Sequence, residues 1–143
     1  MHESNHDGKW FQVALRFQGD GLPVDEIEGR LDIKPSSLGR SGQHVGNGTR
    51  RTKYSTNIWV WSVTKDSSMT FDEQIEDVLQ LLEPKRDALM EILSLPDVEG
   101  ELFLGFSSSN GQGGAHFPPS LLSRIGALGL AMTLDLYAPD GQQ

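Results

Sequence analysis

The sequence predicts a two-layer α+β sandwich, in which a mostly antiparallel sheet of about four strands carries helices on one face. Two observations lead to this class. Four short segments alternate apolar and polar residues, as strands do when only one side of their sheet is covered. Segments with the 3.6-residue period of amphipathic helices lie between those strands. The order favours the ferredoxin-like type, and a doubly wound parallel sheet, whose strands are apolar throughout, is the alternative.

The first half of the chain predicts two strands with a short helix between them. Alternation marks a strand at residues 10–17, and Pro23 suits the first turn of a helix. Residues 36–55 are rich in Ser, Gly, Asn and basic residues, and Asn47-Gly48 favours a tight turn. We therefore expect a loop with a short edge hairpin there. The second strand is expected at residues 58–63.

A long helix is expected from Phe71 to Leu93. Thr70 and Glu73 have the spacing of a capping box, in which each side chain satisfies a backbone donor of the first turn. Pro84 predicts a kink or a restart, because an interior proline removes an intrahelical hydrogen bond and clashes with the preceding turn.

The last third of the chain predicts two more strands around another helix. We expect strands at residues 102–106 and 132–137. Between them, a Gly-rich connection leads through Pro118-Pro119 into a helix that Gly129 closes. The helices should cover the sheet face that carries five aliphatic residues, namely Val13, Leu15, Leu104, Leu134 and Leu136.

Length and composition favour a single domain over residues 1–143, with flexible tails at 1–8 and 139–143. No apolar run approaches the roughly 20 residues that span a bilayer, and the polar N-terminus is unlike a signal peptide. We therefore expect a soluble, cytoplasmic protein with no membrane partner. The chain has no cysteine, which removes disulfides, thiolate nucleophiles and Cys-based zinc sites together.

The charge is unevenly distributed. The formal net charge is -8, yet residues 34–65 contain six basic residues and no carboxylate. Arg40, Arg50, Arg51 and Lys53 of this segment could hold an anion near a Gly-rich loop. Alternatively, these side chains balance the carboxylates of the long helix, or they bind an acidic partner protein. The acidic total counts against nucleic-acid and anionic-membrane binding, while it favours basic partners.

Trp59 and Trp61 lie on one face of the second strand, together with Val63. If the helices cover the opposite face, the tryptophans share an open platform with six other residues, namely Trp10, Arg16, Phe103, Thr133, Asp135 and Tyr137. Such a platform could bind a ligand or stack nucleic-acid bases. However, burying a tryptophan is worth on the order of 4 to 6 kcal/mol, which favours core packing or a homodimer interface.

The remaining motifs do not establish a reaction. Residues 111–114 precede a helix as phosphate-binding turns do, but Gly-Lys-Ser/Thr is absent and Pro118-Pro119 removes backbone donors. The serines of 107–109 stand outside a nucleophile elbow, although His116 and Asp135 could join them in a hydrolase-type site. Carboxylates at 97, 99 and 101 and histidines in the N-terminal tail are explained by solvation. We therefore expect no catalytic residues, no metal and no cofactor.

Five features in this order resemble a bacterial family catalogued as domain of unknown function 4279. They are Leu31-Asp32-Ile33-Lys34-Pro35, the glycines of 39–42, the strand around Trp59, the long helix of 71–93, and Leu134-Asp135-Leu136-Tyr137. The resemblance covers residues 13–137. It implies a single α+β domain in a bacterial cytoplasm, and it carries over no functional residues.

The function that these observations favour is binding without chemistry. We expect a cytoplasmic, immunity-like or regulatory domain that binds another protein, since an acidic domain can capture a basic partner by electrostatic steering. The alternative is a small-molecule or nucleotide sensor that uses the Gly-rich loop and the basic segment. A hydrolase-type enzyme is the third reading. The candidate binding residues are Arg40, Arg50, Arg51, Lys53, Trp59, Trp61, Asp135 and Tyr137.

Overall fold

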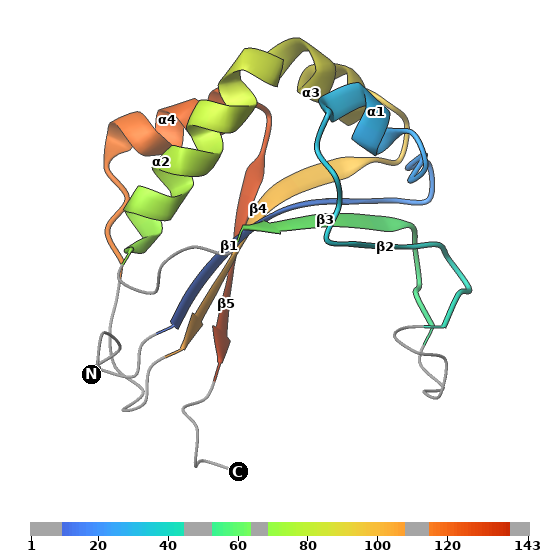
Figure 1. Ribbon diagram of the computed structural model, residues 1–143, viewed down its shortest axis with the longest axis horizontal. Helices are drawn as coiled ribbons and strands as arrows, with labels where there is room; N and C mark the ends of the chain where they lie inside the picture. Colours follow the sequence, from blue (N-terminus) through green and yellow to red (C-terminus); the bar gives the residue numbers. More distant parts are fainter. Residues whose placement is uncertain (1–9, 45–52, 64–68, 108–114, 138–143) are drawn as a thin grey trace.

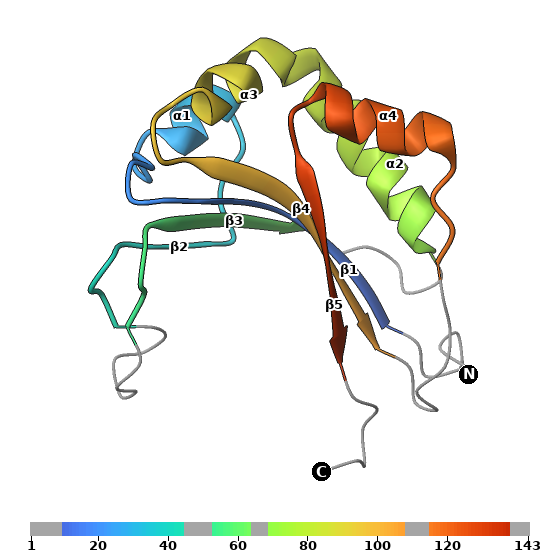
Figure 2. The same ribbon diagram turned by 180° about the vertical axis from the view of Figure 1, so that it is seen from behind.

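A computed structural model describes residues 10–44, 53–63, 69–107 and 115–137 of the chain. Within them, a five-stranded mixed sheet carries a layer of helices on one face (Figures 1 and 2). The expected tails, the Asn47-Gly48 turn and most of the Gly-rich connection lie outside the described residues. The elements, in chain order, are β1 Trp10–Gln18, α1 Ile27–Leu31, β2 Ser37–Gly39, β3 Ile58–Val63, α2 Phe71–Leu82, η1 Glu83–Lys85, α3 Arg86–Leu93, β4 Glu99–Ser107, α4 Pro119–Ala127 and β5 Ala131–Tyr137.

The sheet has the strand order β2-β3-β1-β4-β5. β1 is antiparallel to both β3 and β4, and β2 is antiparallel to β3, whereas β4 and β5 are parallel and are joined through α4. The α+β class is therefore confirmed, and the doubly wound parallel alternative is wrong.

Two finer points of the fold prediction differ from the structure. The sheet has five described strands instead of about four, because three residues of the expected loop form β2 on the edge of β3. So short a strand carries no periodic signal. The ferredoxin-like type is not confirmed, since that type places a strand between two parallel strands of a split βαβ unit. Here β4 and β5 are direct neighbours.

The long helix behaves as its sequence predicts. At its start, the Thr70 backbone N–H donates to Glu73 Oε1 over 2.9 Å, which is one half of the expected capping box. At Pro84 the α-helix gives way to the single 3-10 turn η1, and α3 restarts at Arg86. The proline thus divides the element into two pieces that bend over the sheet (Figure 1).

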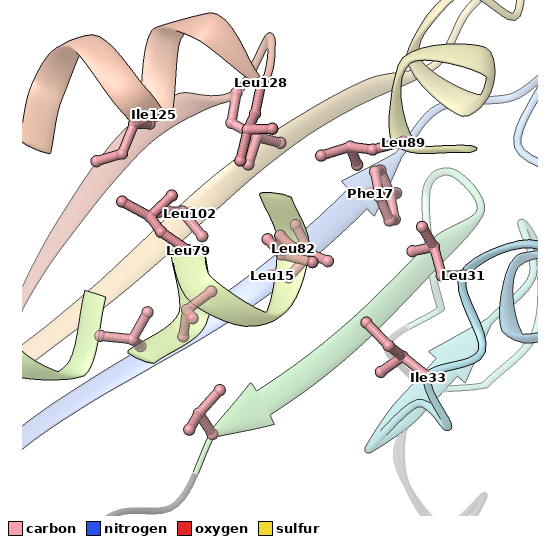
Figure 3. Close-up of a cluster of buried hydrophobic side chains, with 14 of the residues drawn as sticks. Leu15, Phe17, Leu31, Ile33, Leu79, Leu82, Leu89, Leu102, Ile125 and Leu128 are labelled. Atoms are coloured by element: carbon pink, nitrogen blue, oxygen red, sulfur yellow. The ribbon is translucent and has the colours of Figure 1, made fainter. Parts of the chain in front are cut away.

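The core lies between the helices and one face of the sheet. Figure 3 shows side chains of α2, α3 and α4 gathered over β1 and β4. Val13, Leu15 and Leu104 of the expected face are fully buried there. Around them pack the buried side chains of the helices, which include Ile27, Leu31, Ile75, Leu79, Leu82, Leu89, Ile92, Leu121 and Ile125.

The expectation that Leu134 and Leu136 join this core is wrong. Their partners in the parallel register are Leu104 and Phe106, so both leucines point to the helix side of the sheet. Nevertheless, Leu134 is 54% exposed and Leu136 is 66% exposed. The reason is that β5 is an edge strand whose second half runs out beyond the helices (Figure 2).

Candidate functional site

The two tryptophans do not form an open platform. Trp59 pairs with Phe17 and Trp61 pairs with Leu15, so both lie on the helix-covered face. Trp59 is fully buried, with its ring centroid 5.6 Å from that of Phe17, and Trp61 is partly buried. Core packing, the alternative that burial energy favoured, is therefore confirmed for Trp59. Alternation along one strand cannot reveal which of its faces meets the helices, because the pairing register decides that.

The other members of the expected platform lie together on the opposite, open face. Arg16 pairs with Glu101 in the register between β1 and β4, while Thr133 and Asp135 are the β5 partners of Phe103 and Gly105. The side chains of Trp10 and Tyr137 lie outside the described set. Three strands thus bring four of the predicted residues to one face, without the tryptophans.

On this open face, Arg16 and Glu101 form an ion pair. The Arg16 guanidinium donates to Glu101, and its central carbon stands 4.2 Å from the centroid of the Phe103 ring. The Thr133 hydroxyl donates to the other carboxylate oxygen of Glu101. Since both oxygens of Glu101 are engaged, this group ties β1, β4 and β5 together and presents no unpaired charge for catalysis.

Of the four basic residues predicted to hold an anion, Arg40 and Lys53 lie among the described residues. Arg40 forms an ion pair with Asp25, which precedes α1, and its partner is therefore not the long helix that the sequence suggested. Lys53 is exposed and lies in a β-bridge with His44. Arg50 and Arg51 lie outside the described residues.

An acidic groove lies between the first turns of α2 and α4. Its volume is about 440 Å³. Four carboxylates of α2 line it, namely Asp72, Glu73, Glu76 and Asp77. They occupy two rows one turn apart, because the apolar stripe of α2 turns into the core and leaves these positions beside α4. Met69, Pro118 and Leu121 supply apolar surface to the same groove.

Arg124 of α4 holds the two walls of this groove together. Its Nε and Nη2 donate to the two oxygens of Glu83 over 2.8 and 2.9 Å, and its Nη1 donates to Glu76 Oε1 over 2.7 Å. Hydrogen bonds from Arg124 lower the pKa of both carboxyls below the ordinary value of 4.5. In turn, Glu83 and Glu76 raise the pKa of Arg124.

The acidic groove and Arg124 are the features that sequence reasoning missed. The spacing of the four carboxylates along α2 was a visible signal, since no Lys or Arg of the same helix neutralises them. The pairing of α2 with α4 was not visible, because it brings together residues 41 and 48 positions apart.

The other chemical possibilities gain no support from the described residues. Within residues 10–44, 53–63, 69–107 and 115–137, no group of three or more His, Asp or Glu side chains is arranged to hold a metal ion. The serine trio is only partly described, since Ser108 and Ser109 fall outside these ranges. No helix among the described residues is long and apolar enough to cross a membrane.

Comparison with known proteins gives one match. A family model described as Domain of unknown function (DUF4279) matches residues 9–139. No curated protein and no solved structure matches the chain.

Proposed function

The chain belongs to the family described as Domain of unknown function (DUF4279), and we propose that it is a non-enzymatic domain that binds another protein. Its binding site is the acidic groove between α2 and α4. The partner supplies a basic segment whose lysine or arginine side chains enter this groove. An immunity-like role, in which the domain neutralises a basic toxin, and a regulatory role are the two versions of this proposal.

The observation that carries the proposal is the composition of the groove. Four carboxylates stand beside apolar surface from Met69, Pro118 and Leu121. A lysine or arginine side chain is complementary to this surface, because its aliphatic stem packs on apolar side chains while its charged group reaches a carboxylate. The groove therefore suits a basic segment better than an acidic or a purely apolar one.

The charge of the whole molecule supports the same partner. The net charge of -8 attracts basic proteins at long range and speeds their encounter. In addition, residues 40–44, which follow β2 and begin with Arg40, lie at the opposite end of the sheet from the first turns of α2 and α4 (Figures 1 and 2). The positive charge of Arg40 is thus held away from the groove.

The protonation of the groove argues for binding instead of acid–base chemistry. A carboxyl that acts as a general acid near neutral pH needs a raised pKa. Arg124 has the opposite effect on Glu76 and Glu83, whose pKa values it lowers by hydrogen bonding. Glu76, which lines the groove, and Glu83 beside it therefore stay ionised near neutral pH, and Arg124 offsets one of their two charges.

The experiment measures the binding of a lysine- and arginine-rich peptide by fluorescence anisotropy, and locates it by chemical-shift changes in the labelled protein. We expect the shifts to centre on Met69, Asp72 and Leu121, and added salt to weaken binding. The double variant Asp72→Lys/Asp77→Lys should bind at least about tenfold more weakly, because two opposite charges at the groove become like charges.

The matched control is Asp87→Lys/Glu91→Lys. Both residues are exposed on α3, outside the groove, and the control changes the net charge by the same amount. It should retain most of the affinity. Equal losses in the two double variants would show that only overall charge matters, and the groove would then be rejected as the site.

A further inference from the structure

β5 is an unprotected edge of the sheet. Among the described residues it pairs only with β4, and its sequence Ala-Met-Thr-Leu-Asp-Leu-Tyr contains no proline, no lysine and a single charge. Leu134 and Leu136 are the two most exposed large apolar side chains among the described residues. Strand edges of this kind readily accept another strand, since their backbone donors and acceptors lack partners.

The opposite edge of the sheet is protected against pairing with another strand. β2 has only three residues, and beyond it Ser36 closes the edge of β3. The Ser36 backbone N–H donates to the Val60 carbonyl over 2.7 Å, and the Ser62 N–H donates to Ser36 Oγ over 2.8 Å. A short strand and a side-chain cap are common ways to prevent pairing at an edge. The contrast singles out β5 as the edge available for pairing.

We propose that β5 pairs with β5 of a second copy of this chain, antiparallel and about a two-fold axis through Leu134. The pairing joins the two sheets into one and places both helical layers on the same side. An interface of this kind is isologous, because each copy contributes the same strand.

The register follows from self-complementarity. Leu134 is the middle residue of the seven in β5, so pairing about it engages the whole strand. On the helix side, Leu134 then faces Leu134 of the partner subunit, and Met132 faces Leu136 of the partner subunit. On the open face, Asp135 faces Thr133 of the partner subunit, beside a Glu101 that Arg16 already neutralises.

Other registers fit less well. A one-residue slip in a single strand would place helix-side residues opposite open-face residues, because side chains alternate with a period of two. Moving the axis to Asp135 keeps the faces matched, but it sets two Asp135 carboxylates directly opposite each other, which is destabilising. A second copy is therefore the occupant that matches β5 in apolar pattern, length and charge.

The experiment is sedimentation of the full chain over a range of concentrations and salt. The wild type should form a dimer that strengthens with added salt, because two copies with a net charge of -8 repel each other. Leu134→Lys should be monomeric at concentrations where the wild type is dimeric. Leu122→Lys is the matched control, since Leu122 is 46% exposed but lies on α4. It should dimerise as the wild type does.

Cysteine crosslinking tests the register. Because the chain has no native cysteine, only the introduced thiols can form a disulfide. Residues directly opposite in an antiparallel pair have Cβ atoms about 4.5–5.5 Å apart, close to the separation that a disulfide bridges. Leu134→Cys should therefore crosslink to a dimer under mild oxidant, while Leu122→Cys should not. A monomeric wild type, a dimer that survives Leu134→Lys, or faster crosslinking of Asp135→Cys would each overturn the proposal.

Discussion

At the scale of single residues, Trp59 and Trp61 show what can and what cannot be predicted from the sequence. Their shared face was predictable, because β-strands alternate. Burial energy also favoured core packing, which holds for Trp59. The side of the sheet on which they lie was not predictable, since it depends on the partners Phe17 and Leu15 in β1, more than forty positions earlier in the chain. The same holds for Arg16, whose carboxylate partner lies 85 positions away. Sequence patterns are local, whereas these contacts join distant segments.

Truncation of Trp59 should be costly. Trp59→Ala should lower the free energy of unfolding by about 3–5 kcal/mol, because it leaves a cavity beside Phe17 in a packed core. Trp59→Phe should cost much less, since the indole N–H it removes has no hydrogen-bond partner among the described residues. Urea denaturation measures both. Trp61→Ala is the control and should cost less than Trp59→Ala, and an equal loss would contradict the assigned core.

At the scale of elements, most of the secondary structure was predictable and the topology was not. The β3 strand lies at the predicted residues, and the break at Pro84 follows from proline chemistry. A short edge hairpin was expected in residues 36–55, but the strand β2 within that range was not placed, because three residues cannot show a period. The sequence did not predict the strand order, the acidic groove or the exposed half of β5. These features depend on which elements pack together, and contacts between distant parts of the chain determine that packing.

The junction of α4 with α2 should weaken in acid. The folded-state pKa values of Glu76 and Glu83 lie below 4.5, so the stabilisation by Arg124 is fully present above that pH. It is lost as the pH falls through the lowered values. The melting temperature of Arg124→Gln should therefore lie below that of the wild type at neutral pH, and the difference should shrink below about pH 4.5.

The control for this prediction is Arg86→Gln. The Arg86 guanidinium donates to the Ala127 carbonyl, which does not titrate, and the substitution removes the same charge. Its melting temperature should keep a constant offset from the wild type through the acid range. A constant offset for Arg124→Gln as well would contradict the linkage to the two carboxylates.

At the scale of the whole molecule, the two proposed surfaces would act together. Pairing through β5 sets both helical layers on one side, so a dimer would present two acidic grooves in the same direction. Salt should weaken binding at the grooves and strengthen the dimer, because the first joins opposite charges and the second joins like charges. The two interactions can therefore be separated in solution.

Avidity should follow from this arrangement. The wild type should dissociate more slowly from a surface densely coated with basic peptide than Leu134→Lys does, because two linked grooves rebind before release. Their affinities for one peptide free in solution should be equal. Surface plasmon resonance at high and low peptide density makes the comparison. Equal dissociation rates at high density would argue against a dimer with two grooves on one side.

The position of β1 has a consequence for how the chain is made. Among the described strands, β1 comes first in the chain and is central in the sheet, and its pairing with β4 joins Trp10 to Ser107. Pairings so distant in sequence form slowly, because the intervening loop must close first. Until β4 has been translated, the side of β1 that pairs with β4 stays open, and an open strand edge favours aggregation of the growing chain during that interval.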